Sequence, residues 1–475
     1  MRVFCSNPVH MKIHLLKIFC ITIFIFSFSY HLQAQNEAAR RIDSVMQIAN
    51  QRGIFNGNVL VAQKGKIIYQ GSFGYADASG TKKLSPDLRF DVGSITKEFN
   101  GVGIMILQEQ GKLKLDDAVS KYLPSLPAWA QKVKIKHLIN YTSGLPNLSG
   151  TSDETDHVIM DKLATLKELK FEPGTAYIYC HYNVYLQMRI IEKISGMSYA
   201  AFVSKYILGP CKMTHSLIDA PFDGQGIAMA FDNDYQPTAY AQGMSGWVRL
   251  PVTDLYLWTQ CLQSYRVISK ASFRELAVNF PGGESSLGTT SFENDELVWH
   301  QHQGSNSNYE AVLYSNVKDD VTVILMTNKQ DFKVHGIKSA ILSILKNEPF
   351  TIPKKSVYLD IREKVLRDFD NGIAYYLDLK ANHQDAYDFS FELGDLVNTG
   401  KYLLRRDRLD EAIRLFQLAA LINGKATDLS YAYELTGEAY LKKGSKPMAA
   451  IYYQKASLTD KGNKNAAAIL ETLQK

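Results

Sequence analysis

Four strand-like segments constrain the fold of this chain of 475 residues more than any other feature. They cover residues 58–62 and 66–70 near the beginning, and residues 309–315 and 321–327 far downstream. The first two flank a Lys64-Gly65 turn, which is typical of a β-hairpin. A long, mostly helical stretch separates the pairs, and residues 334–346 follow with helical periodicity. This order predicts an α+β domain in which helices pack on an antiparallel sheet.

The N-terminus has the pattern of a secretory signal peptide. Basic residues around Lys17 precede an apolar run over residues 18–30, and small or polar residues follow up to Gln35. The run is too short for a comfortable membrane span, so we expect cleavage after Ala34, which removes residues 1–34. An uncleaved anchor is the alternative. Cleavage predicts a periplasmic or secreted protein with no stable membrane span.

Composition excludes several classes of partner and cofactor. The net charge of +5 arises from 53 basic and 48 acidic residues, and the sequence has no basic stripe or zinc-knuckle spacing, so we expect no nucleic acid partner. Cys180, Cys211 and Cys261 remain after signal cleavage. This odd number at scattered spacing predicts neither a disulfide framework nor a metal site, and no cofactor is expected. Cys180 is interpreted as a packing residue rather than a nucleophile.

The C-terminal part differs from the rest, because it is helical in character and carries an internal repeat. Spacings of 12, 4 and 3 residues separate Gly400, Ala412, Phe416 and Ala419, and the same spacings separate Gly437, Ala449, Tyr453 and Ala456. This resembles the tetratricopeptide repeat, in which small residues let paired helices pack closely. Residues 372–385 are a candidate degenerate pair, and a plain helical bundle is the alternative. We therefore predict a linker at 349–355 and an all-α repeat domain over 356–475, open to a protein partner.

The residues with most chemical promise lie just after position 90. Ser94 and Lys97 are three apart, so on a helix they share one face. A lysine can take the proton of a serine hydroxyl only if burial or its neighbours lower its pKa. The start of a helix also directs free backbone N–H groups at the site, which suits a developing oxyanion. A capping serine beside a solvated lysine is the alternative for this short pattern.

Three further segments are candidates to complete a site with Ser94. Tyr179 and His181 lie in one of them, where a nearby cation such as Lys97 could lower the pKa of the phenol and let it accept a proton. A second segment contains His302, Gly304 and Ser305, which could offer a substrate a hydrogen-bonding ring and an open backbone N–H. We interpret the third, residues 137–145, as a structural transition from helix to loop.

Taken in order, these motifs resemble the serine β-lactamase and penicillin-binding superfamily, in the branch of class C β-lactamases, DD-peptidases and related esterases. Ser94-Ile95-Thr96-Lys97 is similar to its Ser-x-x-Lys motif. Tyr179-Cys180-His181 aligns with its Tyr-Ser-Asn motif, and His302-Gln303-Gly304 takes the place of Lys-Thr-Gly. The resemblance runs from about residue 39 to residue 346. It implies a β-lactamase/transpeptidase-like hydrolase domain over 36–348.

The resemblance also implies a mechanism. Ser94 would attack a carbonyl and form an acyl-enzyme, Lys97 and Tyr179 would share the proton transfers, and the N–H groups of Ser94 and Ser305 would form the oxyanion hole. Two departures concern substrate binding. His181 replaces an asparagine that holds the lysine and the substrate amide, and His302 replaces a lysine that binds a substrate carboxylate.

These observations predict an exported serine hydrolase that acts on a small ester, amide or peptide. The two histidines favour esterase or D-amino-acid peptidase activity over true β-lactamase activity. A non-catalytic binding protein for cell-wall fragments or a protein partner is the alternative. A second, weaker alternative is that the repeat domain, rather than the hydrolase domain, carries the main function.

Overall fold

The structure is a computed structural model that describes residues 37–146, 154–219, 225–233, 235–238 and 243–474. The expected signal peptide and its cleavage site lie outside these residues. Contacts divide the chain into two compact units, with Pro353–Lys475 forming most of the second. Among the described residues, no helix combines the length and apolar character that a membrane crossing requires.

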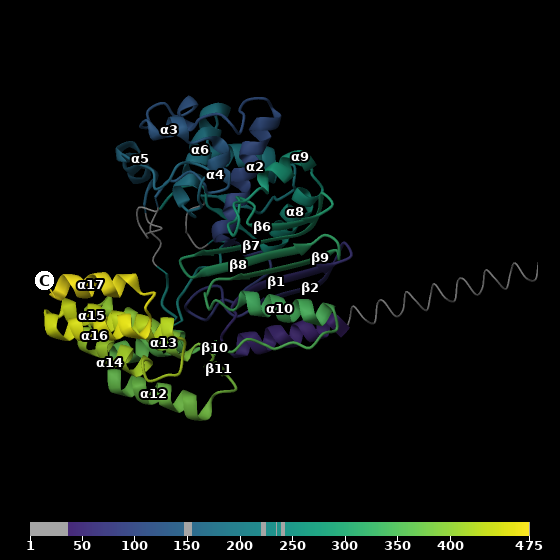
Figure 1. Cartoon of the computed structure of the whole chain (residues 1–475). Coiled ribbons are helices and arrows are strands. Elements are labelled where there is room, and N and C mark those ends of the chain that lie inside the picture. Colours follow the sequence, from purple (N-terminus) through teal and green to yellow (C-terminus); the bar gives the residue numbers. More distant parts are fainter. Residues whose placement is uncertain (1–36, 147–153, 220–224, 234, 239–242, 475) are drawn as a thin grey trace, which may run out of the picture. The chain divides into compact units, whose positions relative to one another are not determined.

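A six-stranded antiparallel sheet is the centre of the first unit (Figure 1). Its strand order is β2-β1-β9-β8-β7-β6. The strands are β1 (Gly57–Gln63), β2 (Lys66–Phe73), β6 (Thr289–Glu293), β7 (Glu296–Asn306), β8 (Tyr309–Asn316) and β9 (Val321–Thr327). A smaller sheet has the order β3-β5-β4, with strands β3 (Phe90–Asp91), β4 (Leu217–Ile218) and β5 (Val248–Leu250).

The pairing of the first strand with a late strand confirms the predicted α+β sheet. Gly57 lies opposite Thr327 in the β1–β9 ladder. The first and the last strand of the sheet in sequence order are therefore neighbours in its interior. A Cβ atom at Gly57 would lie 1.8 Å from the carbonyl oxygen of Met326, which explains the glycine at this contact. Lys64 and Gly65 both have positive φ, at 53° and 69°, as a tight two-residue hairpin turn requires.

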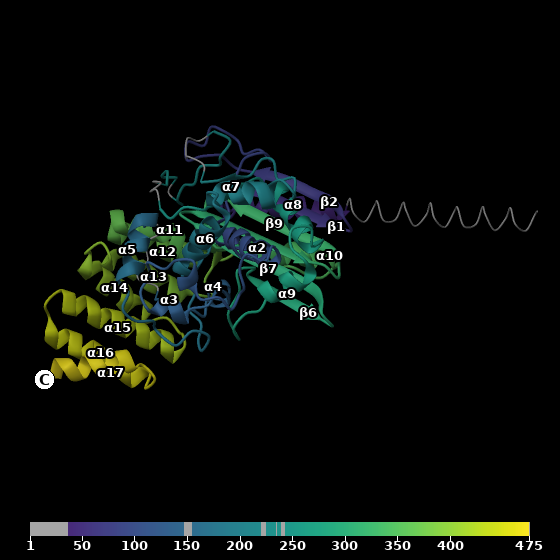
Figure 2. The same ribbon diagram turned by 90° about the horizontal axis from the view of Figure 1, so that it is seen from above.

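Helices cover both faces of the large sheet. Figures 1 and 2 show α10 and the helix over residues 37–51 on one face, with α2, α8 and α9 on the other. The helices and helical turns of this unit are η1 (Gly93–Ile95), α2 (Thr96–Glu109), η2 (Val119–Lys121), α3 (Trp129–Lys132), α4 (Ile135–Ile139), α5 (Asp156–Thr165), α6 (His181–Ser195), α7 (Tyr199–Val203), η3 (Ser204–Leu208), α8 (Val252–Gln263), α9 (Lys270–Leu276) and α10 (Val334–Leu345).

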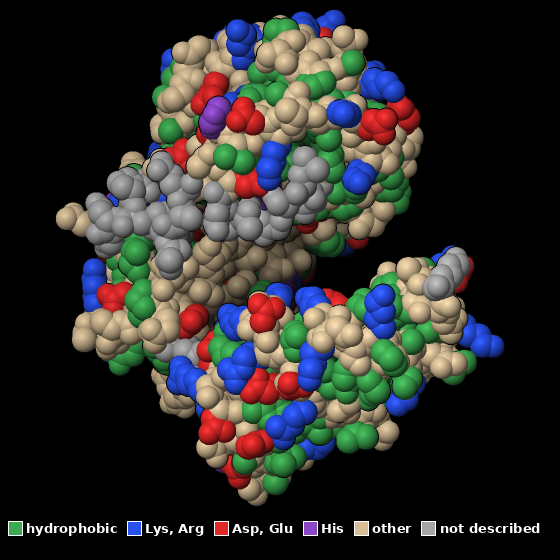
Figure 3. All heavy atoms as spheres, turned by 90° about the vertical axis from the view of Figure 1, so that its left-hand side faces the viewer, with side chains coloured by type: hydrophobic (Ala, Val, Ile, Leu, Met, Phe, Trp, Pro, Cys, Tyr) green, Lys and Arg blue, Asp and Glu red, His purple; other side chains and the backbone are tan. Residues whose placement is uncertain are grey.

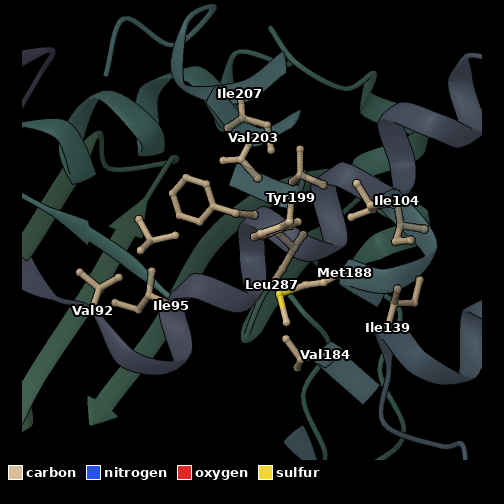
Figure 4. Close-up of a cluster of buried hydrophobic side chains, with 14 of the residues drawn as sticks. Val92, Ile95, Ile104, Ile139, Val184, Met188, Tyr199, Val203, Ile207 and Leu287 are labelled. Atoms are coloured by element: carbon tan, nitrogen blue, oxygen red, sulfur yellow. The ribbon is translucent and has the colours of Figure 1, made fainter. Parts of the chain in front are cut away.

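The core of this unit surrounds α2, which is buried over almost its whole length. Figure 4 shows part of it, where Val92 and Ile95 precede α2 and Ile104 lies within it. Val184 and Met188 approach from α6, and each of these five side chains is at most 2% exposed. Burying an apolar side chain of this size contributes about 1.5–3 kcal/mol. The helix that follows Ser94 is therefore held rigidly by its own packing.

One disulfide bond corrects the expectation drawn from the cysteine spacing. Cys211 and Cys261 are bonded across 50 residues of sequence, while Cys180 is free and buried. The sequence spacing did not indicate this pair, because the two cysteines meet only when α8, which carries Cys261, packs beside the segment after η3, which carries Cys211. The bond cross-links α8 to the segment after η3.

The second unit consists almost entirely of helices. They are α11 (Val357–Arg367), α12 (Phe369–Asn382), α13 (Glu392–Leu404), α14 (Leu409–Ala419), α15 (Ala426–Lys442), α16 (Lys446–Thr459) and α17 (Lys464–Gln474). Two short parallel strands, β10 (Lys355–Ser356) and β11 (Tyr387–Asp388), correct the expectation of a strand-free region. On the face in view in Figure 3, basic and acidic side chains alternate over this unit.

The repeated small residues mark close helix packing. A Cβ atom on Gly400 would lie 2.4 Å from the ring of Phe416, and one on Gly437 would lie 3.0 Å from the ring of Tyr453. The pairs α13–α14 and α15–α16 therefore use the same glycine-to-aromatic contact. The segment expected to hold a degenerate pair, residues 372–385, lies mostly within the single helix α12, and Gly372 of this helix packs against Val365 of α11.

We predict that reduction destabilises the first unit. Loss of a cross-link that closes a loop of about 50 residues removes about 3–4 kcal/mol of unfolding free energy. Reductant should lower the urea midpoint of the wild type, measured by tryptophan fluorescence, because all 4 tryptophans lie in this unit. Cys180→Ala should keep this sensitivity, and the double variant Cys211→Ser/Cys261→Ser should lack it. An unchanged midpoint in reduced wild type would contradict the prediction.

Candidate active site

A constrained turn places Ser94 before α2. The chain leaves β3, Gly93 adopts a φ of +53°, and Ser94 then lies in the short helical turn η1 rather than within α2 as expected. Asp91 fixes this turn, since its carboxylate accepts a hydrogen bond from the Gly93 N–H at 2.8 Å. Asn306 donates to the same carboxylate at 3.1 Å, and Arg249 lies 3.7 Å from it. The position of the serine is thus set by buried polar contacts.

Two predicted partners meet the hydroxyl of Ser94. The Nζ atom of Lys97 lies 2.8 Å from Ser94 Oγ, and the hydroxyl of Tyr179 donates a hydrogen bond to Oγ at 2.7 Å. Lys97 comes from the first turn of α2, while Tyr179 comes from the loop before α6. Three groups separated by as many as 85 residues therefore share one oxygen atom.

Lys97 has the environment that the sequence hypothesis requires. Its side chain is 1% exposed, and burial lowers its pKa from 10.5 to about 7, although the carboxylates of Glu284 and Asp91 act to raise it. Its Nζ atom lies 5.0 Å from the ring centre of Tyr179 and 5.8 Å from that of Trp247. At neutral pH a large fraction of this amine is unprotonated, and its lone pair can then accept the Ser94 proton.

The expected lowering of the Tyr179 pKa is wrong. Burial raises the pKa of this phenol well above its ordinary value, while its hydrogen bond with Ser94 acts to lower it. The proximity of Lys97 does not reverse this, because the desolvation of the buried phenol is the largest effect on its pKa. Tyr179 is therefore a neutral hydrogen-bond donor to Ser94, and Lys97 is the group suited to accept a proton.

His181 lies beside this trio at the start of α6. Its ring centre is 6.0 Å from that of Tyr179 and 6.2 Å from that of Trp247. The charge of Lys97, together with burial, lowers the pKa of His181 to about 3. This imidazole is accordingly neutral at physiological pH and adds no positive charge to the site.

The end of β7 brings a second backbone amide next to Ser94. Ser307 and Asn308 form a two-residue turn, so Asn306 and Tyr309 close the hairpin with paired hydrogen bonds. Hydrogen-bonded and non-hydrogen-bonded pairs alternate along an antiparallel ladder, so Ser305, which precedes Asn306, directs its N–H away from β8. A Cβ atom on Gly93 would lie 2.4 Å from this nitrogen.

Gly304 permits the same close approach from the strand side. A Cβ atom there would lie 2.8 Å from Ser94 N and 1.8 Å from the Val92 carbonyl oxygen. Any larger residue would push β7 away from the turn. The backbone nitrogens of Ser94 and Ser305 thus lie in adjacent segments, and two neighbouring N–H groups of this kind are what an oxyanion hole is built from.

His302 is held inside the protein by a glutamate that the sequence did not single out. Its ring is 2% exposed, and its Nδ1 atom lies 2.9 Å from Glu98 Oε1. His300 Nε2 lies 3.0 Å from the same oxygen, and Trp258 donates to Glu98 Oε2 at 2.6 Å. Burial opposes charge on Glu98, but the two histidines outweigh it and lower its pKa to about 2. The signal available was the alternate spacing of His300 and His302, which places both on one face of a strand.

Other site residues came from segments that received a different interpretation. Tyr141 lies in the segment predicted to be structural, yet its ring centre is 5.0 Å from that of Tyr179 and 6.1 Å from that of Tyr177. Glu284 and Trp247 had no recognisable pattern in the sequence. They reach the site only because loops far apart in the chain converge on Lys97.

The described part of the chain holds no group of three or more His, Cys, Asp or Glu side chains that could bind a metal ion. The chemistry of the trio does not call for one, since a serine, an amine and a phenol suffice for nucleophilic attack and proton transfer.

Comparison with known proteins agrees with this geometry. The family described as Beta-lactamase matches residues 38–345. Penicillin-binding protein 4* of Bacillus subtilis (strain 168) is 28% identical over 361 residues, covering 66% of this chain and 78% of its own length. A class C β-lactamase structure superposes with a TM-score of 0.55 at 18% identity, covering 66% of this chain and 97% of its own. The structure of D-amino acid amidase from Ochrobactrum anthropi SV3 superposes with a TM-score of 0.53 at 19% identity, covering 65% of this chain and 99% of its own.

The family match extends over more than half of the chain. This protein therefore belongs to the Beta-lactamase family, and its first unit has the fold of the β-lactamase and penicillin-binding serine hydrolases.

The pKa of Lys97 predicts the pH dependence of any reaction at Ser94. Because the unprotonated amine is the active form, kcat/KM for a neutral ester should rise with pH and reach half its plateau near pH 7. Lys97→Arg keeps the cation at all pH values and should lower kcat/KM at least about 100-fold. Lys112→Arg, an exposed lysine beyond α2, serves as the matched control. A flat profile between pH 5 and 9 would contradict the prediction.

Proposed function

We propose that this protein is an exported serine hydrolase that forms an acyl-enzyme on Ser94 with an ester or amide substrate. One observation carries the proposal. The hydroxyl of Ser94 lies within 2.8 Å of an amine whose pKa is about 7 and within 2.7 Å of a neutral phenol. A serine is a poor nucleophile without such a neighbour, and this arrangement supplies one.

In the first half of the reaction, Ser94 Oγ attacks the substrate carbonyl carbon while Lys97 accepts the hydroxyl proton. The C=O π pair moves to oxygen, and the N–H groups of Ser94 and Ser305 stabilise the resulting oxyanion. Collapse expels the alcohol or amine, which takes a proton from Lys97 through the hydroxyl of Tyr179. The ester on Ser94 remains as the acyl-enzyme.

In the second half, water replaces the leaving group. Lys97 accepts a proton from the water as it attacks the acyl carbon, and Ser94 leaves with that proton returned through Tyr179 or Lys97. Atoms balance, since one water adds across the cleaved bond. This sequence requires that Lys97 regain its neutral form in each half reaction, which its pKa near 7 permits.

Esters and D-amino-acid amides or peptides are favoured as substrates over β-lactams. The position that carries a substrate-binding lysine in many relatives is His302 here, and its Nδ1 atom is engaged by buried Glu98. His181 is neutral. The site therefore offers no permanent side-chain cation for the carboxylate of a β-lactam, although the N–H groups of the oxyanion hole could donate hydrogen bonds to any carbonyl oxygen.

A non-catalytic binding protein is the alternative, motivated by those same two histidines. A decayed site would be expected to lose the contacts that activate the serine. Here Ser94, Lys97 and Tyr179 retain hydrogen-bonding distances, and the glycine that admits the second amide is present at position 304. These contacts favour catalysis.

Export is supported by the N-terminal sequence and by the disulfide. Residues 1–34 have the pattern of a cleaved signal, and disulfides persist mainly in oxidising compartments such as the periplasm or the extracellular space. We place the hydrolase domain at 36–348 and a linker at 349–355. The helical domain over 356–475 is proposed to be tetratricopeptide-like, on the evidence of its two matching glycine-to-aromatic contacts, and to bind a protein partner.

A fluorophosphonate probe tests the nucleophile. It should label the wild-type protein at Ser94 and fail to label Ser94→Ala, because only the activated hydroxyl attacks phosphorus at a useful rate. Peptide mass spectrometry identifies the modified residue. Ser339→Ala, which removes an exposed serine on α10, should label like the wild type. Equal labelling of Ser94→Ala and wild type would overturn the assignment.

Export has its own test. Expressed with its natural N-terminus in a Gram-negative host, the mature protein should begin at Gln35 and be recovered from the periplasm or medium. Intact-mass measurement of the purified protein reads both the cleavage site and the loss of two hydrogens on disulfide formation. A mature protein that retains residues 1–34 would contradict signal cleavage and favour the anchor.

A further inference from the structure

The charges around Ser94 form an unusual set for binding a substrate. His181 is neutral, Lys97 is buried and largely unprotonated above pH 7, and His302 is engaged by Glu98. One acidic side chain, Glu284, acts electrostatically on Lys97, Tyr179 and their neighbours. The contacts of its backbone and of its carboxylate differ.

The loop that carries Glu284 is fixed against the aromatic wall of the site. Gly283 packs on the ring of Tyr177, where an added Cβ would lie 2.6 Å away, and the backbone of Glu284 contacts the Tyr177 hydroxyl. Two residues later, the N–H of Ser286 donates to the carbonyl of Ile139 at 2.7 Å. Tyr177 in turn packs edge-on against Tyr141, which contacts Tyr179. The backbone of Glu284 is therefore anchored to the row of tyrosines that ends at Ser94.

The side chain of Glu284, in contrast, has no hydrogen-bonding or ion-pair partner among the residues that the structure describes. It is half-buried. Other acidic groups near the site are fully engaged, since Asp91 holds the Gly93 turn and Glu98 holds two histidines. A carboxylate that is anchored at the site and left unpaired can accept a cation supplied from outside.

We propose that Glu284 binds a positively charged ammonium group of the substrate, so that the site selects esters or amides that carry a free amine near the scissile carbonyl. An amino-acid amide or a peptide with a free N-terminus has this chemistry. Acylation of the amine removes the charge, and an anionic substrate would be repelled. The inference deepens the proposed hydrolase function and rests on it for turnover, although binding can be measured separately.

Binding is measured on Ser94→Ala, which cannot turn over substrate, with alanine amide and N-acetylalanine amide of both configurations as probes in calorimetry. The free ammonium should tighten binding about tenfold, corresponding to about 1.4 kcal/mol for a partly screened ion pair. Adding Glu284→Gln should bring the ratio of the two affinities close to one. Adding Glu293→Gln, the same charge change on the exposed surface of β6, should leave the ratio as it was.

Turnover is measured with alanine p-nitroanilide, N-acetylalanine p-nitroanilide and the succinylated compound. The ratio of kcat/KM for the ammonium substrate over the acetylated one should fall about tenfold in Glu284→Gln, and Glu284→Lys should favour the succinylated compound. Because a change in Lys97 would alter kcat/KM for both substrates alike, it cancels in the ratio of the two values. An equal preference for charged and acetylated probes in the wild type, or a ratio unchanged in Glu284→Gln, would overturn the assignment.

The two proposals fail in different ways. If fluorophosphonate does not label Ser94 while Ser94→Ala still prefers alanine amide through Glu284, the hydrolase function is wrong and the ammonium site stands. If esters are cleaved without any charge preference, the hydrolase function stands and the ammonium site is wrong.

Discussion

The buried carboxylate of Glu98 is the contact on which the site depends. It lies next to Lys97 on α2 and receives Trp258 from α8 and both His300 and His302 from β7. Its side chain is fully buried, so removing Trp258 would take away the hydrogen bond that Oε2 accepts, in a medium that cannot replace it. Through this one group, the helix that follows Ser94 is held against β7, the strand that carries Ser305.

The same contact explains why the histidines need not act on substrate. The imidazole of His302 is buried and lies against the carboxylate of Glu98. Burial by itself would lower the pKa of His300, but Glu98 outweighs it and raises that pKa. Positive charge in this region is thereby paired inside the core. The other side of the site holds the neutral ring of His181 and the carboxylate of Glu284, which makes no hydrogen bond or ion pair with the described residues.

Burial also sets the roles within the trio at Ser94. Desolvation penalises whichever form of a group is charged, so it lowers the pKa of Lys97 and raises that of Tyr179. At pH 7 the phenol of Tyr179 is therefore neutral, and a large fraction of the Lys97 amine is unprotonated. Burial of Lys97 and Tyr179 thus brings an amine and a phenol in the protonation states suited to proton transfer next to the hydroxyl of Ser94.

Several features followed from the sequence because they depend on local pattern. Alternating apolar residues and the Lys64-Gly65 turn determined the hairpin, and helical periodicity placed α10 to within a residue of its observed end. Ser94 and Lys97 were found from their spacing on a helix, and Tyr179 from its order relative to them. The matching spacings around Gly400 and Gly437 predicted where helices pack closely.

What the sequence did not determine depends on contacts between distant segments. The pairing of Cys211 with Cys261, the engagement of His302 by Glu98 and the approach of Glu284 to Lys97 each join parts of the chain that only folding brings together. The neutral state of Tyr179 was also misjudged, since a pKa depends on desolvation and a sequence does not reveal which side chains lose water. The sequence by itself predicted Ser94 as the candidate nucleophile and Lys97 as its candidate base, and the tertiary structure decided the charges that surround them.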